Sequence, residues 1–336
     1  MVTLPISSLP TKGLGLITEA VQQITGLFSR RFFFNALLPT FGFTSFTLAV
    51  AILGGGATSV WLARWGNLDL LARLLLILAY IAFVYLLAAA VASQWRNIVR
   101  LFEGYPLVAV ARKLRFESVV GTRWHQQRMK ELLSESLGRP DQAYYKYPPE
   151  KYLSKLLPTR LGNILLAGER YPRDRYGIDA IYFWPRLFPL LPDAFQRDYE
   201  LAVIQYQFPL VVAFQSGVST ILCSAILLGQ QAPPLFFLSV LVVGFALSYA
   251  AYVLSLMSAV ELSEIQRSAF DLYRDRLLMA WPSVQDVTEE KAAFLRIRAF
   301  VVQGAQPIWA KPHDTYTSRH REDQATVIEV KGRRRP

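Results

Sequence analysis

The chain has 336 residues and a formal net charge of +11 at pH 7; 53% of its residues are hydrophobic and 18% are charged. Because about a quarter of the residues in an ordinary soluble domain are charged, this composition excludes a pair of ordinary soluble domains and is typical of an integral membrane protein. Lys and Arg gather on the cytoplasmic side of such proteins, so the basic excess indicates membrane orientation and no nucleic-acid partner is expected.

Residues 1–31 form an N-terminal amphipathic segment. Apolar side chains recur along it at helical spacing: Ile17, Val21, Ile24 and Phe28. Two interpretations stay open. The segment forms a helix in the membrane interface with Arg30 and Arg31 facing lipid head groups, or a helix packed on the soluble part of the chain.

Residues 32–95 are predicted to form a first transmembrane hairpin, with spans at 34–55 and 74–94. The chain carries no charge from Phe32 to Ala63, and about 20 apolar residues in a helix cross the hydrocarbon core. The glycines at 54–56 end the first span. Trp61 and Trp65 follow at the position of an aromatic belt.

Residues 96–205 are too polar to span a membrane and too long for a linker, so they are expected to form a mainly helical cytosolic domain. The apolar pattern predicts a helix over 107–137. A stretch rich in Tyr and Pro at 141–158 is expected to be irregular, and a short helix over 160–167 is expected to end at Gly168.

Residues 206–259 are predicted to form a second hairpin, with spans at 206–228 and 234–258. No Asp, Glu, Lys or Arg occurs from Leu201 to Val260, and Pro233-Pro234 divides the stretch because proline cannot continue a helix. A capping-box pattern at Asp193 and Gln196 predicts that the third span begins as a polar helix.

The chain after the second hairpin is predicted to hold cytosolic helices at 260–304 and a disordered basic tail at 305–336. The fourth span is expected to continue as one helix towards Pro282, and a further helix is expected at 284–303. The fold class is therefore an all-α integral membrane protein, with four transmembrane helices as two hairpins, a mainly helical cytosolic domain between them and a helical C-terminal extension.

The orientation follows from the basic residues beside the spans. Arg30, Arg31, Arg96 and Arg100 flank them on one side. The positive-inside rule places this side in the cytoplasm. We expect a multi-pass protein of the cell inner (plasma) membrane with both termini cytoplasmic.

Several short motifs of the central and C-terminal parts are distinctive: Leu101-Phe-Glu-Gly-Tyr105, Pro158-Thr-Arg-Leu-Gly-Asn163, Tyr176-Gly-Ile-Asp-Ala180, Trp184-Pro-Arg-Leu187 and Phe270-Asp-Leu-Tyr-Arg274. This text resembles that of a family of bacterial multi-pass membrane proteins, over roughly residues 95–280. The resemblance implies a bacterial inner-membrane location. It implies no activity and no residue roles.

Common signatures of enzymes are missing from the sequence, including phosphate-binding and dinucleotide-binding glycine motifs and the zinc-protease motif. The three histidines, His125, His313 and His320, lie in separate contexts. We therefore expect a non-enzymatic protein with no catalytic residue, no metal and no cofactor.

The richest candidate binding site is a set of arginines with two polar neighbours. Arginine forks bind phosphate or carboxylate bidentately, so an anionic ligand or lipid head group could bind here. Salt bridges, caps and turns explain the same residues, and both interpretations stay open. The set comprises Arg160, Asn163, Arg170, Arg173, Arg175, Asp179 and Arg186.

The third span carries an uncharged polar face formed by Gln215, Ser216, Ser219 and Cys223. Such a face serves helix packing through interhelical hydrogen bonds, or lines a pore in an oligomer. Thr40, Thr44 and Thr47 of the first span offer a matching face.

The expected function is that of a scaffold or sensor, whose cytosolic domain binds a partner or an anionic ligand. The alternative is an oligomeric ion channel gated by that domain. Expected partners are the lipid bilayer, anionic lipid head groups, and a second copy of the chain or another membrane or cytosolic protein.

Overall fold

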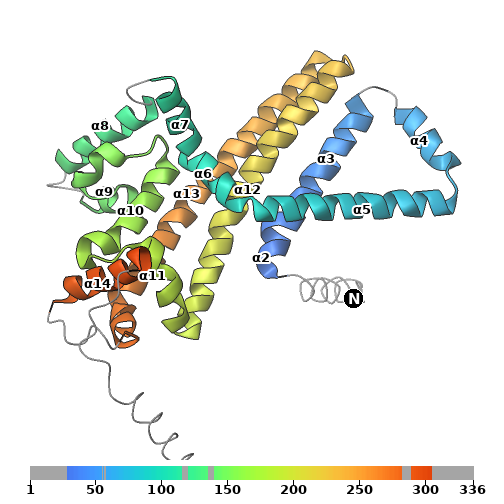
Figure 1. Ribbon diagram of the computed structural model, residues 1–336. Helices are drawn as coiled ribbons and strands as arrows, with labels where there is room; N and C mark the ends of the chain where they lie inside the picture. The colour runs from blue at the N-terminus through green and yellow to red at the C-terminus, as the bar shows by residue number, and fades with distance from the viewer. Residues whose placement is uncertain are drawn as a thin grey trace, which may run out of the picture. The chain divides into compact units, whose positions relative to one another are not determined.

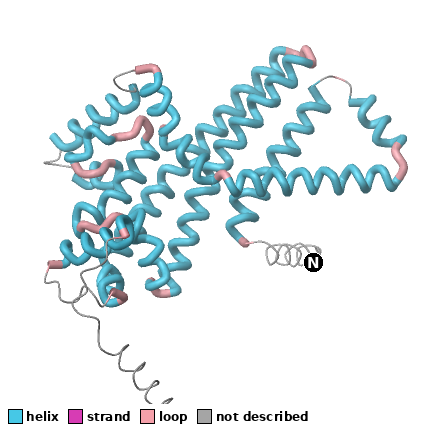
Figure 2. The backbone as a smooth tube through the Cα atoms, in the orientation of Figure 1, coloured by secondary structure: helices cyan, strands magenta, loops and turns pink. Residues whose placement is uncertain are grey.

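The computed structural model describes residues 29–54, 56, 58–115, 120–134, 140–281 and 289–304. Within these ranges every regular element is a helix (Figure 2). The predicted all-α class is therefore confirmed for the described residues. The predicted amphipathic segment up to residue 28 and the predicted tail at 305–336 lie outside them.

The chain divides into two compact units. The first comprises Met1–Tyr171 and Pro192–Ser268, and the second comprises Pro172–Leu191 and Ala269–Pro336. The division falls within two long helices, because α10 and α13 both pass from one unit to the other in sequence.

Four helical stretches are long and apolar enough to cross a membrane: Arg30–Gly54, Leu70–Ser93, Asp193–Gly229 and Pro234–Met279. Their length and composition are those of a membrane protein, and their number agrees with the prediction. Each is about as long as its predicted span or longer. The last two continue well beyond the apolar stretch because no helix-breaking pair occurs in the flanking polar residues.

The first apolar stretch consists of α2 (Arg30–Phe32), a π-helical turn (Phe33–Leu37) and α3 (Leu38–Gly54). Helix α4 (Thr58–Asn67) occupies most of the predicted connection between the first and second spans. The Arg64 guanidinium lies 5.8 Å from the centre of the Trp61 ring. The second stretch is α5 (Leu70–Ser93).

The start of α5 lies four residues before the predicted start of the second span. Asp69 caps this helix, because its carboxylate accepts a hydrogen bond from the backbone N–H of Ala72 at 2.9 Å. The cap starts α5 at Leu70, one turn before the start that the apolar pattern predicts.

The segment between the second and third apolar helices is a set of short helices (Figure 1). The predicted long helix over 107–137 is wrong at its start, because the helix that begins at Tyr105 ends at Lys113 and a second one begins at Val120. The Tyr- and Pro-rich stretch predicted as irregular contains a helix and a 3-10 turn. The elements are α6 (Trp95–Glu103), α7 (Tyr105–Lys113), α8 (Val120–Ser134), α9 (Pro140–Lys146), a 3-10 turn (Glu150–Lys155) and α10 (Arg160–Tyr176).

Helix α10 passes through Gly168, where the sequence predicted a helix end. The glycine serves close packing instead: a Cβ atom built on it would lie 3.0 Å from the Ser263 Oγ atom. The chain does use a glycine terminator at Gly104, which has a left-handed φ of 87° between α6 and α7.

The third and fourth apolar stretches are α12 (Asp193–Gly229) and α13 (Pro234–Met279). Each is a single helix, as predicted for the polar extensions at 193–205 and after 260. The predicted capping box at Asp193 is wrong: Pro192 holds the N-cap position of α12, and no side chain caps the helix.

The helices α12 and α13 lie side by side, joined by hydrogen bonds from serine side chains to backbone carbonyls (Figure 1). The Ser216 hydroxyl donates to the Gly244 carbonyl at 3.0 Å, and the Ser248 hydroxyl donates to the Ala213 carbonyl at 2.8 Å. Small residues allow this close approach.

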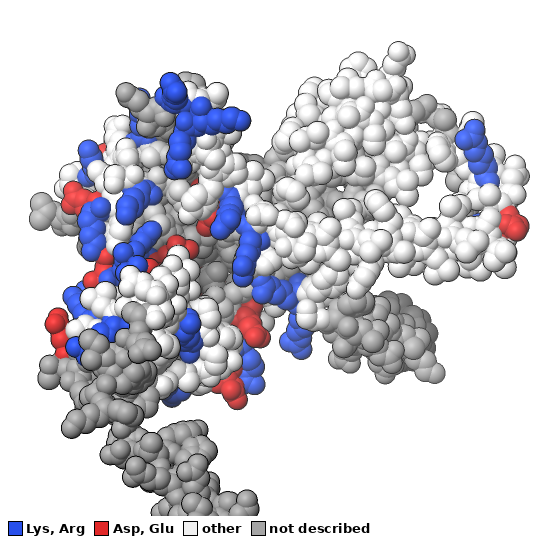
Figure 3. Space-filling model, in the orientation of Figure 1, with Lys and Arg blue, Asp and Glu red and all other residues white. Residues whose placement is uncertain are grey.

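A buried cluster joins α10 to α12 and α13 in the first unit. It is built from Leu161 and Ile164 of α10, with residues of α12 and α13 such as Tyr206 and Ala259. The cluster holds the short helices against the polar-side ends of the two long ones. Charged side chains of this unit gather over the short helices. By contrast, α3, most of α5, the C-terminal part of α12 and the N-terminal part of α13 carry almost none (Figure 3).

The second unit contains α11 (Ala180–Leu187), a 3-10 turn (Phe188–Leu190), the end of α13 and α14 (Glu290–Gln303). Phe183 and Phe294 pack edge to face in its core with ring centroids 5.7 Å apart. The predicted helix at 284–303 agrees with α14 over the described residues.

Candidate functional site

A cavity of about 600 Å³ lies between the short helices and α13, all within the first unit. A volume of this size accommodates a small-molecule ligand. We call it the α8–α13 pocket. Its lining comes from α8, α9 with the residue after it, α10 and α13: Trp124, His125, Arg128, Glu131, Leu132, Gln142, Lys146, Tyr147, Arg160, Ile164, Leu256, Met257 and Val260.

Helical periodicity explains why these residues face one cavity. On α8, His125, Arg128 and Leu132 follow one another at intervals of three and four, so they share one face. Arg160 and Ile164 do the same on α10. The pocket forms where these faces meet a third one on α13.

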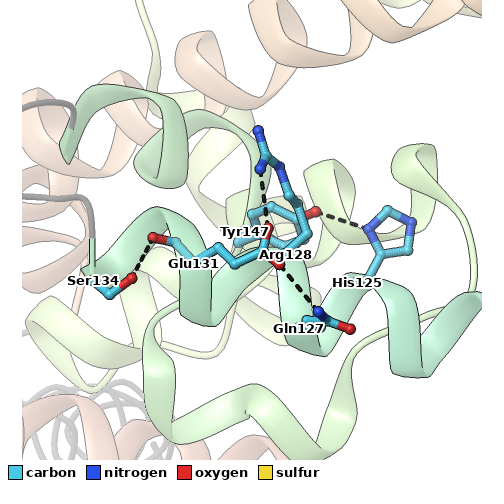
Figure 4. Close-up of polar contacts among 6 residues, drawn as sticks. All are labelled: His125, Gln127, Arg128, Glu131, Ser134 and Tyr147. Carbon is cyan, nitrogen blue, oxygen red and sulfur yellow. Dashed lines mark hydrogen bonds and ion pairs between the residues drawn. The ribbon is translucent and has the colours of Figure 1, made fainter.

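One wall of the pocket is a buried pair of neutral side chains. The His125 Nδ1 atom lies 2.9 Å from the Tyr147 hydroxyl, and the two residues are 3% and 7% exposed (Figure 4). Burial, and secondly the charge of Arg160, lower the pKa of His125 to about 4. Burial raises the pKa of Tyr147. The pair is therefore uncharged near pH 7 and supplies hydrogen-bonding groups alone.

The charge of the pocket comes from its rim. Arg128, Lys146 and Arg160 are cationic, and Glu131 is the one carboxylate in the lining. The Arg128 Nη1 atom lies 3.0 Å from the Glu131 Oε2 atom (Figure 4). Both side chains are more than two-fifths exposed, so this pair contributes little stability. With three cations and one carboxylate, the rim carries a net positive charge.

Trp124 holds one of the rim cations in place. The Arg160 guanidinium lies 5.8 Å from the centre of the Trp124 ring, within the range of a cation–π contact. The stacking leaves the guanidinium edge, which carries the N–H donors, free to face a ligand.

The floor of the pocket is apolar. Leu256, Met257 and Val260 of α13 line it, at the end of the uncharged stretch that precedes Glu261. Met257 is 78% exposed, as expected for a side chain that meets lipid or the tail of a ligand. The pocket thus combines a cationic rim with an apolar floor that continues the apolar surface of α13.

The structure brings one member of the predicted arginine set, Arg160, into this pocket. Asn163 is fully buried and serves the backbone: it accepts a hydrogen bond from the Leu157 N–H at 2.8 Å, and its amide donates to the carbonyls of Leu157 and Thr159. The Arg170 guanidinium stacks on Tyr152 at 5.3 Å.

The other predicted residues belong to the second unit or to its boundary. Arg173 forms an ion pair with Asp179 at 3.7 Å, and Asp179 also caps α11. Arg186 donates to the Tyr182 carbonyl at 2.6 Å. Arg175 lies in the last turn of α10. The two units therefore divide the predicted set.

The predicted polar face of the third span lies against other helices of the same chain. Gln215 donates to the Thr40 hydroxyl at 2.8 Å, and the Ser219 hydroxyl lies 2.7 Å from the Thr47 hydroxyl. Cys223 is fully buried beside them. Together with the bond from Ser216 to α13, these are interhelical packing contacts, and they give no support to a pore lined by this face.

Sequence reasoning missed Trp124, Arg128 and Lys146. The spacing of Trp124 and Arg128 on one helical face was a usable signal. Nothing in the sequence indicated that this face meets α13, more than one hundred residues away.

Among the described residues, no group of three or more His, Cys, Asp or Glu side chains is placed to hold a metal ion. No family model, curated protein or solved structure matches the chain.

Proposed function

We propose that the chain is a non-enzymatic multi-pass membrane protein whose central helical domain binds an anionic amphiphile in the α8–α13 pocket. The observation that carries the proposal is the joining of a cationic rim, formed by Arg128, Lys146 and Arg160, to an apolar floor from α13. Binding there would let the domain act as a sensor or scaffold that responds to the lipid composition beside it.

The physical reason for an amphiphile is that neither half of the pocket suits a fully polar ligand. Hydrogen bonds from charged donors contribute about 1.5–3 kcal/mol each, and burial of an acyl chain against Leu256 and Val260 adds about 0.8 kcal/mol per CH₂ group. A small free anion would form the charged hydrogen bonds but would bury no apolar surface against α13.

The topology we propose has two transmembrane hairpins, with the domain and both termini in the cytoplasm of a cell with a plasma (inner) membrane. Contacts near both ends of the first apolar stretch (Arg30–Gly54) support parallel first and third spans: Arg31 bonds to Gln207 near one end, and Gln230 bonds to the Ala51 carbonyl near the other. The polar-side ends carry the arginines, in agreement with the positive-inside rule.

The test is lipid binding to the purified full chain in nanodiscs. Native mass spectrometry would compare phosphatidylglycerol, which is anionic, with phosphatidylcholine, which has the same chains and no net charge. We expect phosphatidylglycerol to bind more tightly, and Arg160→Gln and Arg128→Gln each to weaken it about tenfold, equivalent to about 1.4 kcal/mol.

Arg112→Gln is the matched control, because Arg112 is an exposed arginine of α7 outside the pocket and its replacement removes the same charge. Equal weakening by all three variants would indicate a diffuse surface charge and would overturn the proposed site. Selective conductance in liposomes that Gln215→Leu abolishes would instead establish the channel.

A further inference from the structure

A second cavity, of about 290 Å³, lies where the beginning of the first apolar helix meets the end of α5 and the side of α12. Its polar lining includes Arg31, Asn35, Trp95 and Gln207. We call it the Arg31 pocket. It shares no residue with the α8–α13 pocket.

The hydrogen bonds around Gln207 determine which way the Asn35 amide points. The Gln207 Oε1 atom accepts from the Arg31 Nε–H at 2.9 Å and from the Asn35 Nδ2–H at 3.2 Å. Since Arg31 is a donor only, the Gln207 atom must be the oxygen, and the Asn35 atom that faces it must be the nitrogen. The Asn35 oxygen is consequently the atom left for another partner.

The Asn35 Oδ1 atom is buried, and no described residue donates a hydrogen bond to it. Asn35 as a whole is 6% exposed. An unsatisfied buried acceptor costs about 1–3 kcal/mol, so a ligand that brings a donor to this oxygen gains that amount. Asn35 also lies in the π-helical turn Phe33–Leu37, and π-helical turns are frequent at functional sites.

Arg31 provides a site for an anion at the mouth of the same pocket. Its guanidinium lies 5.0 Å from the centre of the Trp95 ring, and the Arg96 guanidinium lies 5.6 Å from the same centre. The bond to Gln207 uses the Nε–H alone. The Nη groups bond to no described residue, so they remain for a phosphate, which arginine binds as a fork.

The two groups are separated by one helical turn along the chain, a rise of about 6 Å. Arg31 lies at the polar end of the first apolar stretch, and Asn35 lies one turn further into its apolar part. A diacyl phospholipid presents only ester oxygens below its phosphate, and these are acceptors that would face the Asn35 oxygen unfavourably. A ligand that satisfies both groups needs an anion and, next to it, a hydrogen-bond donor.

We propose that the Arg31 pocket binds a monoacyl phospholipid, whose phosphate ester keeps a free hydroxyl on the neighbouring glycerol carbon. The phosphate binds the Arg31 Nη groups beside Trp95, the hydroxyl donates to the Asn35 Oδ1 atom, and the acyl chain follows the apolar surfaces of α5 and α12. The site discriminates monoacyl from diacyl lipids, which the α8–α13 pocket has no means to do.

The experiment compares 1-oleoyl-glycerol phosphate with its dioleoyl counterpart. The two share the phosphate and one acyl chain, and they differ at one glycerol carbon, which carries a free hydroxyl in the first and a second acyl ester in the other. Binding to the full chain in detergent is measured by native mass spectrometry, and folding is checked by thermal unfolding. We expect wild type to bind the monoacyl lipid about tenfold more tightly. Asn35→Leu, which has the same branching at Cγ and lacks the acceptor, should abolish that preference and leave diacyl binding unchanged.

Further variants separate the parts of the proposal. Arg31→Gln should weaken the binding of both lipids, because it removes the cation that binds the phosphate. Arg128→Gln, in the α8–α13 pocket, should leave the monoacyl preference unchanged. The experiment can therefore refute the proposed site in one pocket without refuting the site in the other. Equal binding of both lipids by wild type, or a preference that survives in Asn35→Leu, would show that the Asn35 oxygen does not select the lipid and would overturn the proposal.

Discussion

Replacement of Gly244 by alanine should separate α12 from α13. A Cβ atom built on Gly244 would lie 2.0 Å from the Thr220 Oγ1 atom and 3.0 Å from both the Cβ and Cγ2 atoms of Thr220. Rotation of the threonine side chain gives incomplete relief, because the Thr220 Cβ atom stays at 3.0 Å in every rotamer. The helices must therefore move apart by about 1 Å to restore an ordinary van der Waals distance.

The movement would weaken two interhelical hydrogen bonds, those of Ser216 to the Gly244 carbonyl and of Ser248 to the Ala213 carbonyl. Overpacking costs about 1–3 kcal/mol, and an interhelical bond in a membrane contributes about 0.6 kcal/mol. We expect Gly244→Ala to lower the free energy of unfolding by about 2 kcal/mol. Equilibrium unfolding in mixed micelles of a mild detergent and dodecyl sulfate measures it.

Two comparisons test the reasoning. Gly42→Ala is the control, because a Cβ atom on Gly42 meets nothing within 4 Å and alanine favours a helix more than glycine does; this variant should be at least as stable as wild type. In a double-mutant cycle, Thr220→Ala should recover at least half of the loss caused by Gly244→Ala. Strictly additive effects, or an unchanged stability of Gly244→Ala, would refute the close-approach explanation.

Two further predictions concern the central domain. Asn163→Ala should lower the free energy of unfolding by roughly 2–4 kcal/mol, because it removes the side-chain partner of the buried Leu157 N–H and of the Leu157 carbonyl; thermal unfolding measures it, and a loss below 1 kcal/mol would contradict the role. Burial, followed by the charge of Glu169, raises the pKa of Glu103 from 4.5 to about 7. Between these values the folded state holds a proton that the unfolded state has lost, so stability should fall as the pH rises from about 4.5 to 7, by at most about 3 kcal/mol; Glu103→Gln should flatten this part of the profile, and an unchanged slope would contradict it.

The sequence by itself determined the number and class of the long helices. Hydrophobicity and the absence of charge are properties of a contiguous stretch, so Leu201–Val260 could be interpreted without any knowledge of its neighbours. The unbroken helices α12 and α13 were predictable for the same reason, since no helix breaker lies in their polar extensions. Local signals failed where a residue's role depends on packing: Gly168, expected to end a helix, instead provides room for Ser263.

Only the tertiary structure decided which polar side chains share a cavity. Arg160 looked equivalent to Arg173 and Arg186 in the sequence, yet it is the one that stacks on Trp124 beside α13. Gln207 bridges Arg31 and Asn35, which lie more than 170 residues earlier. Such contacts depend on how helix faces that are far apart in the sequence pack against each other. Neither the composition nor the hydrophobic periodicity of one segment contains that information.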